Sequence, residues 1–160
     1  MQNISPCLWL DGNLEEAVNF YTSIFKNSLI KNVTRYGDGA PLPRGSIMTV
    51  TFQLDGVEFM GISGGPEYNF TPAISFFVKC ETQEQIDDLW EKLSTGGEAR
   101  RCGWVKDRFG ISWQIVPTLL GNYLQDKDGE RAKRVLDTML RMDKIIISDL
   151  IAAYEGAIHP

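Results

Sequence analysis

The sequence predicts an α+β protein built from two tandem βαβββ modules and a set of C-terminal helices. Two observations predict the modules. The pattern near the N-terminus indicates a strand, an amphipathic helix and three short strands in succession, and the same order returns about 69 positions later. A third observation is that the pattern after Pro117 is helical. With 160 residues, the chain is expected to form a single domain over residues 1–160.

The first module is predicted over residues 3–65. Residues 4–10 form a candidate strand, which Asp11-Gly12 ends. Asn13 is a candidate N-cap with Glu16 as its reciprocal partner. The helix that follows carries apolar residues at helical spacing, namely Ala17, Phe20, Tyr21, Ile24 and Phe25.

Three strands are expected after this helix, over residues 29–37, 46–54 and 57–62. Asp55-Gly56 separates the last two and is a signal for a two-residue hairpin turn. The glycine-rich stretch 61–66 then favours a connection between the modules.

The second module is predicted over residues 70–117. It begins with a strand over 73–80, and Thr82 is a candidate N-cap with Gln85 as its partner. Gly96-Gly97 ends the predicted helix, whose apolar stripe consists of Ile86, Leu89, Trp90 and Leu93.

Short strands near 98–106 and 111–116 complete this module, with a turn over 107–110. The remaining residues, 118–160, are predicted to form a helical extension packed on the outside of the sheet. Its last helix is expected from Ser148 to near Gly156.

Composition excludes several classes of function. The net charge of −5 and the lack of a dense Lys/Arg cluster argue against nucleic-acid binding. No apolar run is long enough to span a membrane, and the N-terminus lacks the pattern of a signal peptide. We therefore expect a cytoplasmic protein whose three cysteines are reduced thiols.

The number of histidines is the most informative part of the composition. The chain has one histidine, His159, and it stands beside the last residue. Acid–base catalysis near neutral pH and transition-metal binding usually need imidazole. The body of this chain is therefore poorly equipped for either chemistry.

The chain resembles the vicinal oxygen chelate superfamily, which includes glyoxalase I, bleomycin-resistance proteins and extradiol dioxygenases, and within it the PhnB-like branch. The resemblance covers nearly the whole chain. It rests on the tandem βαβββ order and on these residues: Leu10-Asp11-Gly12-Asn13, Glu16-Ala17, Phe20-Tyr21, Ser75, Trp90, Gly96-Gly97 and the run from Cys102 to Pro117.

The resemblance implies that each module forms half of an open barrel around a concave site. Metal-dependent members place four ligands there, usually His and Glu. The corresponding positions in this chain are Ser5, Met60, Ser75 and Gln114. Because these residues supply no imidazole, thiolate or carboxylate, we expect no metal and no cofactor.

The candidate ligand pocket combines aromatic and polar residues from the strands. It consists of Trp9, Met60, Ser75, Trp104, Trp113 and Gln114. Strand tryptophans can equally well be core residues, and the two interpretations have similar weight. For Glu58 and Lys106 we favour a solvated outer face, although alternation alone does not determine the face.

The function predicted from these observations is metal-free binding of an apolar or aromatic small molecule. One alternative is a metal-dependent lyase, isomerase or dioxygenase. A second is the 3-demethylubiquinone-9 3-methyltransferase activity with which PhnB-like proteins are often labelled, although no glycine-rich loop for S-adenosylmethionine follows the first strand. A homodimer is also expected, because half-barrels leave open sheet edges.

Overall fold

The computed structural model describes residues 3–157, which divide between Asn69 and Phe70 into two compact units. Each unit contains one four-stranded mixed sheet. The predicted α+β class and the βαβββ order, present twice, are confirmed. Among the helices of residues 3–157, none is long and apolar enough to cross a bilayer.

Unit 1 is the first βαβββ module. Its strands lie in the order β1-β4-β3-β2, with β1 and β4 parallel and the other pairs antiparallel. Its elements are β1 (Cys7–Asp11), α1 (Leu14–Ile24), β2 (Leu29–Arg35), β3 (Ile47–Leu54) and β4 (Val57–Gly64).

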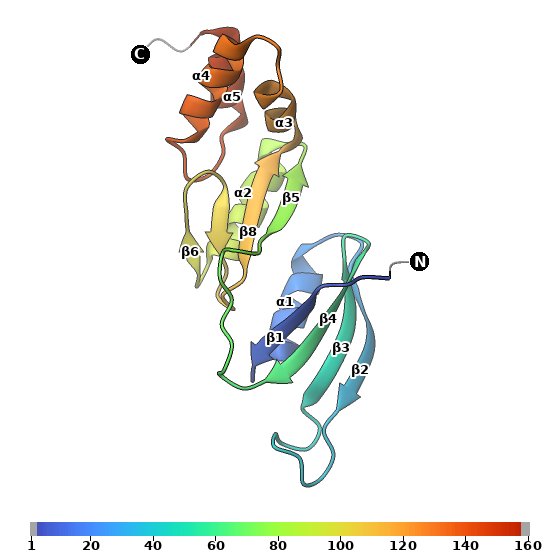
Figure 1. Cartoon of the computed structure of the whole chain (residues 1–160). Coiled ribbons are helices and arrows are strands. Elements are labelled where there is room, and N and C mark those ends of the chain that lie inside the picture. Colours follow the sequence, from blue (N-terminus) through green and yellow to red (C-terminus); the bar gives the residue numbers. More distant parts are fainter. Residues whose placement is uncertain (1–2, 158–160) are drawn as a thin grey trace. The chain divides into compact units, whose positions relative to one another are not determined.

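Helix α1 packs on one face of this sheet (Figure 1). Leu8 and Leu10 of β1 are buried, whereas the residues between and beside them are more exposed, as strand alternation requires. Gly61 of β4 allows the helix to approach closely, because a Cβ there would lie 2.5 Å from a methyl carbon of Leu14. The buried face of the sheet is thus the face toward α1.

The hairpin between β3 and β4 follows the predicted turn. Leu54 pairs with Val57, so Asp55 and Gly56 form a two-residue loop. Their φ angles, 47° and 81°, are both positive, which is the type I′ geometry that matches the twist of a hairpin. This prediction from the sequence is confirmed.

Unit 2 contains the second module and the C-terminal helices. The strand order is β5-β8-β7-β6, with β5 and β8 parallel, and α2 lies along one side of the sheet (Figure 1). Its elements are β5 (Phe76–Cys80), α2 (Gln83–Ser94), β6 (Glu98–Ala99), β7 (Trp104–Lys106), β8 (Ser112–Pro117), α3 (Thr118–Leu124), α4 (Gly129–Met139) and α5 (Ile147–Glu155).

The two predicted helix caps have different outcomes. Thr82 is extended and its hydroxyl accepts the backbone N–H of Gln85, as predicted, while the Gln85 side chain accepts from Glu81 rather than from Thr82. The predicted side-chain cap at Asn13 is wrong. With ψ at 21°, Asn13 lacks the extended conformation that aims a capping side chain at the helix, and no side-chain cap bond forms.

The segment predicted as a strand near 98–106 consists of two short strands joined by a tight turn. Cys102 and Gly103 have φ angles of 60° and 81°, which break the strand. Their backbone N–H groups donate to the carbonyls of Met142 and Asp143 at 2.9 and 2.8 Å. The C-terminal extension therefore holds this turn in place.

The helices after β8 share a hydrophobic cluster with the end of that strand. Its buried members are Val116, Leu120, Val135, Ile145, Leu150 and Ala153. Gln83 at the start of α2 also joins the extension, because its side chain donates to the carbonyl of Ile145 and accepts from the N–H of Ile147. Apolar packing and polar contacts thus both attach the extension to the second module.

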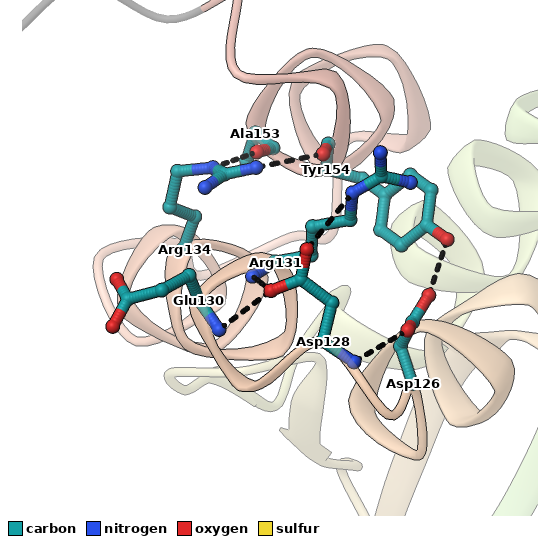
Figure 2. Close-up of polar contacts among 7 residues, drawn as sticks. All are labelled: Asp126, Asp128, Glu130, Arg131, Arg134, Ala153 and Tyr154. Carbon is teal, nitrogen blue, oxygen red and sulfur yellow. Dashed lines mark hydrogen bonds and ion pairs between the residues drawn. The ribbon is translucent and has the colours of Figure 1, made fainter.

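A polar network connects α4 and α5 with the loop between α3 and α4 (Figure 2). Asp128 caps α4 by accepting from the backbone of Glu130, and Arg134 donates to the carbonyls of Ala153 and Tyr154 at 2.8 and 3.0 Å. The Tyr154 hydroxyl donates to Asp126, and this hydrogen bond is the main reason why the pKa of Asp126 lies below its ordinary value.

Candidate functional site

The sheet of unit 2 has one face covered by α2 and one that is not. Val105 and Ile115 are fully buried and share the α2 side with Trp113. We call the other side the open face of unit 2; it carries Ser75, Phe77, Lys79, Trp104, Lys106 and Gln114. Four of these six residues were predicted from the sequence as pocket or strand candidates.

A hydrogen bond joins the two polar residues predicted for the pocket in unit 2. The side-chain amide of Gln114 donates to the Ser75 hydroxyl at 2.9 Å. The hydroxyl proton of Ser75, and the second N–H and the oxygen of the Gln114 amide, remain for other partners. The pair therefore presents both donors and acceptors on the open face.

Two aromatic side chains flank this pair. Gln114 is directly opposite Phe77 on β5 and directly opposite Trp104 on β7. Phe77 is 54% exposed and Trp104 is half-buried. The structure thus assembles a row of aromatic, amide and aromatic side chains across three strands.

Trp113 lies on the other face of β8 from Gln114. Its side chain is 3% exposed, its ring centroid is 5.2 Å from that of Phe76, and its indole N–H donates to Asp107 at 2.8 Å. Adjacent strand residues point to opposite faces, so Trp113 and Gln114 cannot line the same surface. Trp113 supports the site from the core side.

The open face of unit 1 is the side of its sheet away from α1. It carries Trp9, Thr51, Glu58, Met60 and Ile62. Met60 is 39% exposed, and Trp9 is fixed by a hydrogen bond to the Gly65 carbonyl at 2.9 Å and by an edge contact with Tyr68. Gly64 makes this position of the indole possible, because a Cβ there would lie 1.9 Å from the ring.

Glu58 and Lys106 both lie on open faces, beside Met60 and Trp104 respectively. Glu58 accepts from Lys31 at 3.1 Å and from the Ser5 hydroxyl at 3.4 Å. Glu58 and Lys106 therefore lie on the same faces as the pocket candidates Met60 and Trp104. The sequence pattern favoured a solvated outer face for both residues.

The sequence matches the model of the 3-demethylubiquinone-9 3-methyltransferase family over residues 2–116. The chain belongs to this family. The match stops one residue before the end of β8, so the three C-terminal helices lie outside it. A search of the curated proteins found no match to this sequence.

Solved structures agree with this assignment. A PhnB protein from Bacillus cereus, whose name presents it as a candidate 3-demethylubiquinone-9 3-methyltransferase, is 38% identical, covers 73% of this chain and 100% of its own, and superposes with a TM-score of 0.70. Protein PA1353 from Pseudomonas aeruginosa is 21% identical over 73% of this chain and 98% of its own, with a TM-score of 0.61.

The fold extends to a more distant relative. The fosfomycin resistance protein FosX from Listeria monocytogenes is 14% identical over 78% of this chain and 98% of its own, with a TM-score of 0.56. The chain is thus a PhnB-like member of the 3-demethylubiquinone-9 3-methyltransferase family, as the sequence motifs predict, and it shares its fold with FosX.

The residues that the resemblance places at metal positions do not fit a divalent transition metal. Ser5, Met60, Ser75 and Gln114 offer hydroxyl, thioether and amide groups, where such metals favour imidazole, thiolate or carboxylate. Within residues 3–157, no three His, Cys, Asp or Glu side chains are grouped for metal binding. His159 lies outside the described residues.

Two cavities, one within each unit, lie at the ends of the sheets. One of about 410 Å³ in unit 2 is bounded by the loop 96–98 and the turn 106–110. Another of about 200 Å³ in unit 1 lies between the start of α1 and the loop 42–47. Apart from Lys106, neither includes a residue of the two open faces.

The sequence missed three contributors to the candidate surfaces. Phe77 and Lys79 share the face of Ser75, a relation that alternation along the strand predicts once Ser75 is chosen. Tyr68 comes from the connection after β4 and contacts Trp9 edge-on at 5.1 Å between ring centroids. No pattern in the sequence signals that contact.

Proposed function

We propose that this PhnB-like protein binds a small apolar or aromatic molecule on the open face of unit 2, without a metal ion. The observation that carries the proposal is the hydrogen-bonded pair of Gln114 and Ser75 between the rings of Phe77 and Trp104. Ligand sites commonly combine apolar walls with a few oriented polar groups.

The aromatic residues supply the apolar part of this surface. Phe77 is 54% exposed, and neither Phe77 nor Trp104 has a ring contact within the described part of the chain. Contiguous exposed apolar patches are typical of ligand or partner sites, and the exposed Phe77 lies in one row with the half-buried Trp104. Their faces are available for stacking against a planar ligand.

A metal-dependent enzyme is the first alternative, and the donor set argues against it. A FosX structure from Listeria monocytogenes with this general fold is complexed with Mn(II). In the present chain, however, the Ser75 hydroxyl is already engaged by the Gln114 amide. Such neutral groups would hold a transition metal weakly.

Methyl transfer is the second alternative, and the topology argues against it. Nucleotide-type cofactors are typically bound at the switch point of a doubly wound parallel sheet. Here the parallel pairs are β1–β4 and β5–β8, and the remaining pairs in each sheet are antiparallel. The family name therefore describes a relationship rather than the activity proposed for this chain.

The test is a titration of the purified full chain with 1-naphthalenemethanol, with and without EDTA. We expect the same affinity in both buffers and less than stoichiometric metal by elemental analysis. Phe77→Ala should weaken binding about 3- to 10-fold by removing stacking surface. Leu140→Ala removes an apolar side chain of similar exposure (48%) from the end of α4 and should leave affinity unchanged.

Two results would contradict the proposal. One is a tightly held Zn, Ni, Mn or Fe ion in each chain whose removal abolishes binding. The other is binding that Phe77→Ala and Leu140→Ala weaken equally, because that would place the ligand away from the open face of unit 2.

A further inference from the structure

The open face of unit 2 carries two lysines that form no ion pair within the described residues, although Glu98 attracts Lys106 electrostatically. Lys79 and Lys106 form no ion pair and no side-chain hydrogen bond within the described part of the chain. By contrast, Lys92 and Lys144 elsewhere in unit 2 are paired with Asp88 and Asp87. The charge of the two open-face lysines is therefore not neutralised by an ion pair.

The acidic side chain nearest to Lys106 in the strand ladder is already neutralised. Glu98 lies opposite Lys106, but both of its carboxylate oxygens accept from Arg100, at 3.1 and 3.2 Å. The hydrogen bond from Arg100 is also the main cause that holds the pKa of Glu98 below its ordinary value. Glu98, Arg100 and Lys106 together leave one positive charge.

The neutral polar groups on this face are also mostly donors. The indole N–H of Trp104 has no hydrogen-bond partner in residues 3–157. The Ser75 oxygen accepts a hydrogen bond from the Gln114 amide and keeps its own O–H to donate, and the second N–H of that amide is a further donor. The Gln114 amide oxygen is the acceptor, so donors exceed acceptors.

We infer that the ligand of this face is a small aromatic anion, a planar ring bearing a carboxylate or a similar negatively charged group. The inference rests on the proposed function and narrows its ligand class. Phe77 and Trp104 offer stacking surfaces, and Lys106, Trp104 and Ser75 offer the donors that a carboxylate requires.

The same arrangement limits the size of the ligand. Val116 follows Gln114 on this face of β8 and is buried in the cluster formed by the C-terminal helices. The extension thereby closes the face beyond the Phe77–Gln114–Trp104 row. A ring system placed on that row extends toward Ser75 and Lys106 instead.

Overall charge predicts the opposite preference. The net charge of −5 favours cations at long range, whereas a ligand that extends toward Ser75 meets the local charge of Lys106. At physiological salt, screening weakens the interaction between charges that are more than about 8 Å apart. The charged side chains closest to the ligand therefore determine its preferred charge.

The experiment compares three probes of one shape on the full chain: 1-naphthoate, 1-naphthalenemethanol and 1-naphthylmethylammonium. We expect naphthoate to bind about tenfold more tightly than the alcohol, and the ammonium to bind most weakly. Lys106→Gln should lower naphthoate affinity about three- to fivefold and leave the affinity for the alcohol unchanged. Lys133→Gln, with the same change of charge on α4, is the matched control and should leave all three affinities unchanged.

The outcomes separate this inference from the proposed function. Equal affinities for the three probes, or an equal loss in Lys106→Gln and Lys133→Gln, overturn the anionic ligand and leave aromatic binding standing. If none of the probes binds, the proposed function fails and the inference fails with it.

Discussion

The carboxylate of Asp107 and the indole of Trp113 form a hydrogen bond of 2.8 Å inside unit 2, and both side chains are almost completely buried. Asp107 also accepts the backbone N–H groups of Phe109 and Ile111 at 2.8 and 3.0 Å. The bond therefore joins the turn before β8 to the face of β8 opposite Gln114. It sets the orientation of the strand that carries the proposed ligand contacts.

The first prediction concerns this bond. Asp107→Asn places an amide group where the carboxylate accepts, and we expect it to lower the free energy of unfolding by about 1–3 kcal/mol, because a buried N–H loses its partner. In a Trp113→Phe background the indole N–H is absent, so the added cost should be smaller. Urea unfolding of the four proteins of the cycle measures this coupling, and strictly additive costs would contradict it.

The second prediction concerns Gly64 and Trp9. Gly64→Ala introduces a Cβ 1.9 Å from the indole ring, so Trp9 must leave its hydrogen bond with Gly65. We expect a loss of about 1–3 kcal/mol of stability and a change in tryptophan fluorescence. Gly37→Ala is the control, because a Cβ there meets no atom within 4 Å. Equal stability of the two variants would show that Trp9 is not held in this position.

The third prediction concerns pH and the C-terminal helices. Asp126 has a lowered pKa because Tyr154 donates to it. A carboxyl group with a lowered folded-state pKa stabilises the protein above its unfolded pKa of about 3.9, and this stability is lost as the pH falls through the folded value. The extension should therefore lose the stability that this hydrogen bond provides as the pH falls through the folded-state pKa of Asp126.

Tyr154→Phe tests this cause directly. The pKa of Asp126, measured by NMR titration of its carboxyl carbon, should rise toward the ordinary value. Tyr123→Phe is the control: its ring stacks on Tyr154 at 4.0 Å between centroids, but no hydrogen bond joins its hydroxyl to a described residue. A pKa of Asp126 that responds equally to both variants would argue against the hydrogen bond as the cause.

The fourth prediction concerns assembly. Strand β2 is an edge strand whose residues are all exposed, including Leu29, Ile30 and Val33. An exposed apolar edge strand presents unpaired backbone groups that can pair with a second copy of the chain. We expect sedimentation to give twice the chain mass of 18.0 kDa at micromolar concentration. A species of 18.0 kDa would contradict the dimer.

The architecture was predictable because it rests on local and periodic signals. The residue types of Asp55-Gly56 favour a hairpin turn by themselves, and apolar residues recur at helical spacing in both modules. The break at Cys102 was not predictable, because its positive φ depends on carbonyls of the C-terminal extension some 40 residues away. The missing cap at Asn13 likewise depends on a backbone angle that the residue type does not specify.

The site was predictable only in part. Ser75 and Gln114 were selected together and are hydrogen-bonded to each other. Trp113 was selected beside Gln114, although residues adjacent in a strand face opposite sides. Choosing between the two faces requires knowing which one α2 covers. Burial of Trp113 and its bond to Asp107 supply that information, and the sequence pattern does not.

The most direct test of metal-independent aromatic binding is an NMR titration of the EDTA-treated full chain with 1-naphthoate, observed at the tryptophan indole N–H signals. The indole of Trp104 has no hydrogen-bond partner in the described chain, whereas that of Trp113 is bonded to Asp107. The account predicts a saturable shift of the Trp104 signal with little change at Trp113. A Trp104 signal that stays in place, or that moves only after a divalent metal is added, would contradict it.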